Sequence, residues 1–341
     1  MALDVHLECD ERCFDLPEWR TLLDRDPNAH IFATPEWSRL WWEELGSGKE
    51  LFLLKMMRGD DVAALVPLYR KPEPEGDSGC FRFVGGIELT DYLGPICSEG
   101  DRAEVAEALI EWLADAPVEW TEFDAHNMPV PFGFAEFLVE RADNRGFRFA
   151  LEQEETSAVL PLPGDWDSYL QSLDSKQRHE LRRKRRRIGR DHPDAAFRTS
   201  TEDTLEGDLK IFIDMHRGAQ GRKGHFLFGE IVTFFERIAK AFMPLGWLRL
   251  DFLEIAGKPV ASTFSFEFGN SFYLYNSAYD DEAARVSPGL VLVSELVKRS
   301  IDNGLDRFDF LRGPERYKYQ LGGQAVPLNN VRVLNEPKVG A

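Results

Sequence analysis

The chain of 341 residues contains few cysteines and no long apolar run. Cys9, Cys13, Cys80 and Cys97 are too few and too unevenly spaced for a disulfide framework, and Cys9 with Cys13 lacks the second ligand pair of a structural zinc site. No segment approaches the roughly 18 uncharged residues of a membrane-spanning helix, and the acidic N-terminus does not resemble a signal peptide. We therefore expect free thiols, no metal, no membrane span and a cytoplasmic location.

Several motifs of common enzyme classes are missing as well. The sequence has no Gly-rich dinucleotide fingerprint, no P-loop, no His-Glu-x-x-His and no Gly-x-Ser-x-Gly elbow. These absences argue against hydride transfer, ATP hydrolysis, zinc proteolysis and the serine hydrolase chemistry of that elbow. The seven histidines are scattered. A lone histidine such as His216 is more often a packed or exposed residue than a catalyst, so none is counted as a site residue.

Basic residues are scarce overall but concentrated in one segment. The formal net charge is −18, which argues against a surface that coats nucleic acid. Between Lys176 and Arg190, nine basic side chains and the single acid Glu180 give a charge of +8, which leaves −26 for the rest of the chain. Leu173, Leu181 and Ile188 fall at helical spacing. The segment 174–190 is therefore predicted to be a cationic helix capped by Asp174 or Ser175.

This basic helix has two interpretations. Its arginines pair with the acidic excess of the chain, or they contact phosphates, whose oxygens suit the forked guanidinium better than an ammonium. A nuclear localisation signal is a third and weaker option, because short basic runs match such signals by chance.

The chain contains two similar arrangements of elements. Residues 51–57 and 62–69 predict a β-hairpin, and residues 247–255 and 260–268 predict another, with Val-Ala after each turn. Each hairpin is followed by a strand, a loop, a helix and a strand carrying Phe-Asp, at Phe123-Asp124 and at Phe308-Asp309. Together with the length, this repetition favours an α/β (α+β) fold of two similar domains, 1–155 and 156–341. Helices are expected at 35–45, 103–113, 169–189, 207–217, 230–242 and 290–303.

The last hundred residues carry the chemical signal. The predicted strand 271–279 leads into a loop with Ser287, Pro288 and Gly289 and then into a helix. The first backbone N–H groups of a helix have no intrahelical partner, and the helix dipole favours negative charge at that end. The loop is therefore a candidate phosphate site.

These segments resemble a known family. Residues 273–280 (YLYNSAYD), 287–289 (SPG) and 308–313 (FDFLRG), together with Glu315, Tyr317 and Lys318, resemble the BioF2-like and CelD-like acyltransferases of the GNAT superfamily, which are similar to the Fem aminoacyl transferases. The basic segment also resembles this family. The similarity extends over about residues 150–330 and is thinner in the first half, where residues 90–95 (TDYLGP) carry it.

The resemblance implies a tandem GNAT-like fold of two mixed sheets flanked by helices, with an acyl-CoA donor, acetyl-CoA in particular, bound by the second domain. In such folds the donor enters a V-shaped gap between two parallel strands, and its pyrophosphate lies at the start of the next helix. The implied donor-binding residues are Arg285, Ser287, Gly289 and Leu290. The loop departs from the usual Arg/Gln-x-x-Gly-x-Gly/Ala pattern, having Arg285 to Val291 as RVSPGLV.

Candidate catalytic groups follow from the same resemblance. The general base that removes the amine proton is sought among Asp309, Glu267 and Glu315. Asp309 lies between Phe308 and Phe310 on a predicted strand, where burial raises a carboxyl pKa; pairing with Arg307 or Arg312 is the alternative. Tyr275 and Tyr317 are candidate acids for the leaving thiolate or, alternatively, packing residues.

Substrate contacts are predicted in both domains. Arg312, Tyr317 and Lys318 lie near a Gly-Pro turn, where the two cations would clamp a carboxylate or phosphate unless they form surface ion pairs. Asp91 and Tyr92 are predicted to line the acceptor groove in the first domain.

Three functions remain open. The first is an N-acyltransferase that moves an acyl group from acyl-CoA to an amine of a small molecule or of an envelope or polysaccharide precursor. The second is a Fem-like transferase that takes its donor from charged tRNA through the basic helix, although no long helical hairpin is inserted between the halves. The third is a non-catalytic GNAT-like protein that binds an anion or a partner.

Overall fold

The computed structural model describes residues 3–72, 79–218 and 228–337, and these form two compact units. Unit 1 comprises Met1–Thr156 and Val326–Ala341, and unit 2 comprises Ser157–Ala325. Two long strands, β7 (Phe147–Pro161) and β13 (Gln324–Pro337), contribute residues to both units. The predicted boundary near residue 155 therefore coincides with a strand, and the last segment of the chain groups with unit 1 because β13 pairs with β6 (Glu122–Pro129) of that unit.

Unit 1 has a mixed sheet in the order β1-β2-β3-β4-β6-β13, in which β4 and β6 are parallel and the other neighbours antiparallel. Its remaining elements, in chain order, are β1 (Asp4–Glu8), η1 (Glu11–Asp15), α1 (Glu18–Arg25), η2 (Ile31–Ala33), α2 (Pro35–Leu45), β2 (Glu50–Arg58), β3 (Asp61–Arg70), β4 (Cys80–Phe83), β5 (Ile96–Cys97), η3 (Glu99–Asp101), α3 (Arg102–Ala114), η4 (Val130–Phe132) and α4 (Phe134–Arg145).

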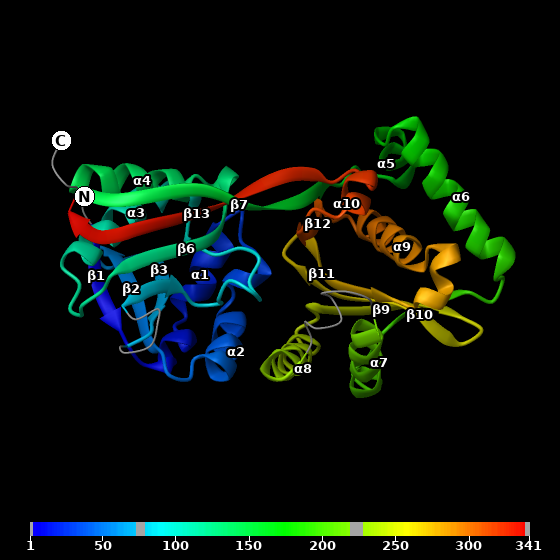
Figure 1. Ribbon diagram of the computed structural model, residues 1–341, viewed down its shortest axis with the longest axis horizontal. Coiled ribbons are helices and arrows are strands. Elements are labelled where there is room, and N and C mark those ends of the chain that lie inside the picture. The colour runs from blue at the N-terminus through cyan, green and yellow to red at the C-terminus, as the bar shows by residue number, and fades with distance from the viewer. Residues whose placement is uncertain (1–2, 73–78, 219–227, 338–341) are drawn as a thin grey trace. The chain divides into compact units, whose positions relative to one another are not determined.

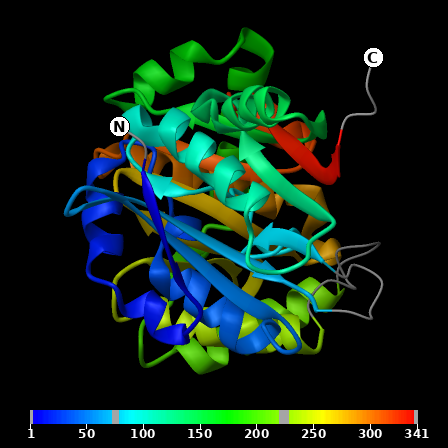
Figure 2. The ribbon, with the colours of Figure 1, turned by 90° about the vertical axis from the view of Figure 1, so that its left-hand side faces the viewer.

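Helices cover both faces of this sheet. Helices α3 and α4 lie on one face and α1 and α2 on the other (Figure 1), and the view onto unit 1 shows the same layers (Figure 2). Leu109 and Leu138 from the first pair of helices bury their side chains against Phe81 and Phe123 of the sheet. On the opposite face, Trp37 of α2 is fully buried.

Unit 2 repeats the arrangement with the order β7-β12-β11-β10-β9-β8, in which β11 and β12 are parallel. Its elements are α5 (Trp166–Ser172), α6 (Ser175–Asp191), β8 (Ala196–Thr199), α7 (Leu205–Gly218), α8 (Glu230–Phe242), β9 (Leu248–Ile255), β10 (Lys258–Phe268), β11 (Ser271–Tyr279), η6 (Asp281–Val286), α9 (Pro288–Asp302), β12 (Arg307–Arg312) and α10 (Arg316–Gln320).

The two faces of the unit 2 sheet have different covers. Helix α9 lies on one face and helices α7 and α8 lie on the other (Figure 1). Val293 and Val297 of α9 pack in a core with Phe272 and Phe308, whose rings stack with centroids 4.8 Å apart. On the opposite face, Phe235 of α8 contacts the ring of Phe264. Alternation along β11 therefore sends side chains into two separate layers.

The predicted hairpins and most predicted helices are confirmed. One expectation was wrong: residues 169–189 do not form a single helix, because the chain is extended at Leu173 (φ −71°, ψ 147°) and a new helix begins after Asp174. Leu173 is buried in the unit 2 core, and the Asp174 side chain accepts a hydrogen bond from Gln177 N. The extended, buried Leu173 thus ends α5, and the Asp174 carboxylate caps the start of α6.

Candidate active site

A cavity of about 300 Å³ opens in unit 2 where β11 and β12 cease to pair. The last pair of residues in the parallel ladder is Tyr273 and Asp309, although β11 continues to Tyr279. The lining side chains come from both strands, from α7, and from α10 and the turn before it. They are His216, Leu274, Tyr275, Asn276, Ser277, Phe310, Arg312, Glu315, Tyr317 and Lys318.

Strand β12 leaves the ladder because it contains a bulge. Leu311 has a left-handed backbone (φ 59°), and the register against β7 shifts between Asp309 and Arg312. Asp309 is 2% exposed, and its Oδ1 accepts a hydrogen bond from Leu311 N at 2.8 Å. A non-glycine residue seldom adopts this conformation, so the carboxylate stabilises it locally. Asp309 therefore shapes the end of β12, and its role as general base stays a prediction.

Strand β11 also bulges at the cavity. Phe264 of β10 pairs with Asn276 and Phe266 pairs with Tyr273, so two residues of β11, Leu274 and Tyr275, lie opposite a single residue of β10. A bulge of this kind changes the direction of the side chains that follow it. Asn276 and Ser277 line the cavity directly after this bulge.

A histidine from α7 joins the cavity wall. His216 is 1% exposed, and its Nε2 lies 3.1 Å from Oδ1 of Asn276. The same oxygen accepts a hydrogen bond from Ser277 N at 2.9 Å. The sequence analysis did not count His216 among the site residues, because a single histidine on an amphipathic helix carries no local sign of a site. The contact that places it here joins residues 60 positions apart.

Two tyrosines predicted as acids line the same cavity but differ in surroundings. Tyr275 stacks on Phe235 with ring centroids 5.4 Å apart. Burial raises the pKa of Tyr317, and a hydrogen bond with Ser277 acts in the opposite direction to a smaller extent. The raised pKa keeps the Tyr317 hydroxyl protonated at neutral pH but also makes it a weaker acid toward a leaving thiolate. The catalytic role of either tyrosine stays a prediction.

The predicted cations also reach the cavity. The ammonium of Lys318 is almost fully buried and donates to Leu311 O at 3.1 Å, and it lies 2.9 Å from a carboxylate oxygen of Glu315. It also bonds the carbonyl of Arg312. Lys318 therefore stabilises the backbone at the end of β12 and in the turn that follows it. Contact of Arg312, Tyr317 and Lys318 with substrate stays a prediction.

Three other predicted residues lie elsewhere. Glu267 is near the opposite end of β11, where it pairs with Phe272, and its carboxylate lies 3.1 Å from Arg249 Nε. Asp91 and Tyr92 are buried residues of unit 1. The ring of Tyr92 meets that of His30 edge to face, with centroids 5.5 Å apart. The role of Asp91 and Tyr92 as acceptor contacts stays a prediction, and so does the role of Glu267 as general base.

The predicted phosphate loop leads into α9. Ser287 has a left-handed backbone (φ 55°) and makes no side-chain cap, Pro288 is the first helical residue, and the first turn of α9 contains no acid. A Cβ at Gly289 would lie 3.4 Å from the ring of Tyr279. Leu290 packs against the unit 2 core and Arg285 is exposed. Free N–H groups and a first turn without acids make this helix start compatible with an anion, and Asp281 and Glu282 lie in the preceding η6.

Unit 1 differs at both of the equivalent positions. Acids precede or open α3 at Glu99, Asp101 and Glu104, and two of these pair with Arg58. The parallel ladder of β4 and β6 ends at the pair of Phe81 and Phe123. The chain after β4 does not continue as a strand there but forms the loop 84–95.

Asn127 at the end of β6 bonds this loop from both its backbone and its side chain. Its amide donates to Ile87 O at 3.1 Å and to Thr90 O at 2.8 Å, and its carbonyl accepts from Leu93 N at 3.1 Å. The gap in unit 1 is thus filled by the chain itself.

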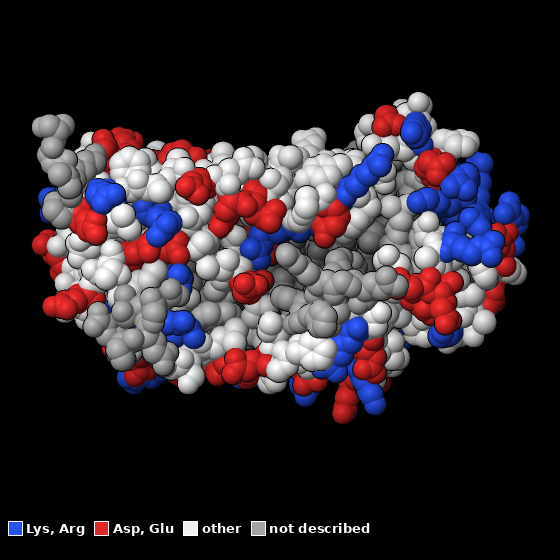
Figure 3. All heavy atoms as spheres, in the orientation of Figure 1, with Lys and Arg blue, Asp and Glu red and all other residues white. Residues whose placement is uncertain are grey.

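The basic helix α6 carries a groove of about 650 Å³ that is lined by residues of this helix alone. Lys and Arg side chains gather over it in the space-filling view (Figure 3), whereas acids are spread over the rest of that face. The lining residues are Ser175, Arg178, His179, Arg182, Arg183, Arg186, Arg187, Arg190 and Asp191.

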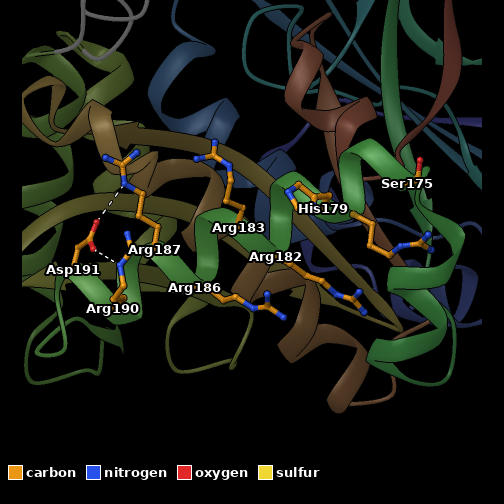
Figure 4. Close-up of a pocket in the computed structure, with 9 residues that line it drawn as sticks. Ser175, His179, Arg182, Arg183, Arg186, Arg187, Arg190 and Asp191 are labelled. Carbon is orange, nitrogen blue, oxygen red and sulfur yellow. Dashed lines mark hydrogen bonds and ion pairs between the residues drawn. The ribbon is translucent and has the colours of Figure 1, made fainter.

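Some of these arginines are paired and some are not. Arg183 pairs with Glu180, and Arg187 and Arg190 pair with Asp191. Among the described residues, Arg182 and Arg186 have no ion-pair partner, and both extend from one side of α6, apart from the Asp191 pairs (Figure 4). Ion pairing therefore accounts for Arg183, Arg187 and Arg190, whereas phosphate contact by Arg182 and Arg186 stays a prediction.

Comparison with known proteins finds a family match for a segment of unit 2 and structural likeness for nearly the whole chain. Residues 175–319 match the family model "Acetyltransferase (GNAT) domain". This segment contains α6, the cavity and the phosphate loop, so the chain carries a GNAT-type acyltransferase domain. No curated protein sequence matches the chain.

Solved structures resemble nearly the whole chain. FemX superposes with a TM-score of 0.68 at 12% identity, covering 97% of this chain and 98% of FemX. The C-terminal domain of a putative lysylphosphatidylglycerol synthetase from Agrobacterium fabrum gives 0.54 at 12% identity, with 93% of each chain covered. A tandem GNAT protein from the clavulanic acid biosynthesis pathway gives 0.50 at 11% identity, covering 98% of this chain and 100% of that one. These likenesses establish the predicted tandem GNAT-like fold.

The described residues contain neither a metal-binding cluster nor a membrane-spanning helix. No three or more His, Cys, Asp or Glu side chains within 3–72, 79–218 and 228–337 are grouped so that they hold a metal ion. In the same ranges, no helix has the length and the apolar character that crossing a bilayer requires.

Proposed function

Because residues 175–319 form a GNAT-type domain, we propose that this protein is an N-acyltransferase that uses acyl-CoA, and acetyl-CoA in particular. The acceptor would be an amine of a small molecule or of an envelope or polysaccharide precursor. One observation carries the proposal: the cavity between the separated ends of β11 and β12 is open, and it lies in the same unit as a helix start without acids. An acyl-CoA donor would place the reaction in the cytoplasm.

The donor would use two parts of unit 2. Its pyrophosphate would lie against the start of α9, with Ser287, Gly289 and Leu290 supplying backbone and Arg285 supplying charge. Its thioester would lie in the cavity beside β11. A phosphate gains from both the free N–H groups and the helix dipole, whereas the acids at the start of α3 in unit 1 would repel it.

The reaction itself needs proton transfer at two atoms. The attacking amine would lose a proton to a general base, for which the candidates are Glu315 in the cavity wall, Asp309 at the bulge of β12, and Glu267 of β10, which pairs with Phe272 of β11. The leaving thiolate gains a proton, for which Tyr317 or Tyr275 is suited by position. Arg312 and Lys318 would attract an anionic group of the acceptor, and Asp91 and Tyr92 are the proposed acceptor contacts of unit 1.

The donor site is tested by calorimetry with acetyl-CoA. Gly289→Trp places a large side chain in the first turn of α9, beside the Tyr279 ring, and is expected to abolish binding. Gly207→Trp in α7 is a matched control, because a Cβ there meets no atom within 4 Å. Unchanged affinity in a folded Gly289→Trp protein would sink the assignment. Product formation is then sought by mass spectrometry against a panel of primary amines.

Helix α6 favours a second candidate function, transfer from an aminoacyl-tRNA. The groove contains six arginines, of which three have no ion-pair partner in the described part of the chain: Arg178, which donates to backbone carbonyls, Arg182 and Arg186. A polyanion that neutralises them releases counterions, so its binding weakens steeply with salt. Charged tRNA is expected to be retained at low salt and lost in an Arg182→Gln, Arg186→Gln variant.

The control for this experiment is an Arg145→Gln, Arg148→Gln variant, which removes two exposed arginines of unit 1 and the same amount of charge. Equal loss of tRNA binding in both variants would mean that only net charge matters. If no acyl donor stabilised the protein thermally while polyanions did, the non-catalytic, anion-binding interpretation would replace both enzymatic ones.

A further inference from the structure

We propose that the side-chain amide of Asn276 donates a hydrogen bond to the carbonyl oxygen of the acyl donor and stabilises the negative charge that develops there during transfer. The inference rests on the proposed function, since it requires an acyl donor in the cavity of unit 2. Asn276 lines that cavity directly after the bulge in β11.

The orientation of this amide is determined by its neighbours. Ser277 N lies 2.9 Å from one atom of the Asn276 side chain, and a backbone N–H can only donate, so that atom is the oxygen Oδ1. His216 Nε2 lies 3.1 Å from the same oxygen and must also donate. Two donors on Oδ1 therefore fix the amide and require a proton on Nε2 of His216.

The nitrogen of the same amide remains available. All hydrogen bonds of the Asn276 side chain within the described residues involve Oδ1, so both protons of Nδ2 are left for a ligand. The residue is partly exposed in the cavity. A polar N–H group that is held in place before the ligand arrives loses little free energy by reorganisation when charge appears near it.

His216 acts through Asn276 and is a positioning residue. Its imidazole is 1% exposed and lies beside the ring of Phe212, with centroids 6.0 Å apart. Because the imidazole is buried, its orientation is restricted by its neighbours. Its Nε2–H donates to the Asn276 oxygen from α7, and Ser277 N–H donates to the same oxygen from β11. The two contacts together aim Nδ2 away from both donors.

The proposed step conserves atoms and electrons. The amine nitrogen attacks the thioester carbon, a C–N bond forms, and the π pair of the C=O bond moves to oxygen, where Asn276 Nδ2–H donates to it. The pair then returns, the C=O bond forms again and the C–S bond breaks. The sulfur leaves as CoA thiolate and takes one proton, while the amine proton passes to a general base. The products are an amide and CoA.

The test uses acetyl-CoA labelled with ¹³C at the carbonyl. The bound carbonyl resonance of the unaltered protein is expected downfield of the free resonance, because hydrogen bonding polarises the C=O bond. Asn276→Ala and the isosteric Asn276→Asp are expected to lose this shift while CoA itself still binds by calorimetry. Asn144→Ala, at an exposed position of α4, is the matched control and keeps the shift.

His216 is tested with the same signal. His216→Ala is expected to reduce the shift, and His216→Gln, which retains a side-chain N–H donor, is expected to restore part of it. His6→Ala, at an exposed residue of β1, leaves it unchanged. With an acceptor amine in hand, Asn276→Ala is expected to lower kcat by about 10²- to 10³-fold, with a smaller change in KM for the donor.

The outcomes separate the two proposals. An unchanged carbonyl shift in both Asn276 variants, with acetyl-CoA bound, would overturn the role of Asn276 and leave the acyltransferase proposal standing. No binding of acetyl-CoA to the unaltered protein would overturn the proposed donor, and the inference with it.

Discussion

The Oδ1 atom of Asp309 accepts a hydrogen bond from the backbone N–H of Leu311 at 2.8 Å, and this contact stabilises the bulge at which β12 separates from β11. Removing the side chain in Asp309→Ala leaves that buried N–H without its acceptor, and we expect a loss of about 1–3 kcal/mol in the free energy of unfolding. Denaturant titration measures it.

Asp309→Asn distinguishes a structural role from a catalytic one. The amide still offers an oxygen to Leu311 N–H, so we expect a smaller loss of stability and a transfer rate within a few-fold of the unaltered protein. A rate lowered by about 10²- to 10⁴-fold, with unchanged CoA affinity, would instead identify Asp309 as the general base. The rate is measured on whichever amine the acceptor screen returns.

The start of α9 provides a second prediction. Ser287 has φ 55° and forms no side-chain cap, so its side chain brings steric cost without a compensating bond. The left-handed region costs a non-glycine residue roughly 1–2 kcal/mol, partly offset by the greater entropy of glycine in the unfolded chain. Ser287→Gly is therefore expected to raise the thermal unfolding midpoint slightly and to retain CoA affinity. A lower midpoint would show that the serine hydroxyl has a partner during folding or binding.

A partly buried histidine of unit 1, His126, predicts how the free energy of unfolding depends on pH. Burial by itself lowers the pKa of His126, but hydrogen bonds with Asp124 and Glu154 outweigh it and raise the pKa to about 9. The folded pKa exceeds the ordinary value of 6.5, so the contribution to stability is complete below about pH 6.5 and is lost as the pH rises through 9. The contribution of His126 to the free energy of unfolding amounts to roughly 3 kcal/mol at most.

Asp124, the hydrogen-bond partner of His126, determines how the free energy of unfolding changes at acidic pH. Burial raises the pKa of Asp124, but hydrogen bonds with His126 and Asn330 outweigh it and lower the pKa to about 2. Its contribution is present above the ordinary value of 3.8 and is lost as the pH falls through 2. Unfolding free energies measured across this range should show a plateau between about pH 4 and 6.5. His126→Gln should flatten the alkaline side, and His6→Gln should not.

Much of the fold is predictable because its elements have local signals. The hairpin of β9 and β10 alternates apolar and polar residues around a turn at Gly257, and α2 begins with Thr34 and Pro35, which cap and open a helix. The pair Phe123-Asp124 and Phe308-Asp309 is also found at equivalent places, each at the end of a parallel ladder. Local patterns and the repetition together predict two similar units.

The cavity is harder to predict because its causes are not local. The bulges at Leu274 and at Leu311 lie in apolar runs that contain no glycine, and they appear only when the neighbouring strands are paired. His216 reaches Asn276 from a helix 60 residues away. The loop 84–95 likewise gives no sign in its sequence that it fills the gap of unit 1. The sequence therefore indicates the phosphate loop. It does not indicate that the parallel strands of unit 2, rather than those of unit 1, separate to form a cavity.

The filled gap of unit 1 predicts one donor per chain. Asn127 holds the loop 84–95 through Ile87 O, Thr90 O and Leu93 N, and acids open α3, so the described residues of unit 1 do not reproduce the features on which the proposed donor site of unit 2 rests. Calorimetry with acetyl-CoA is expected to give a stoichiometry of one. Asn127→Ala should lower the midpoint of thermal unfolding by removing two hydrogen bonds of a buried amide, without adding a second site or changing the affinity of the first. Two equivalent donors per chain, or a donor affinity that falls with Asn127→Ala as far as with Gly289→Trp, would contradict the assignment of the donor to unit 2.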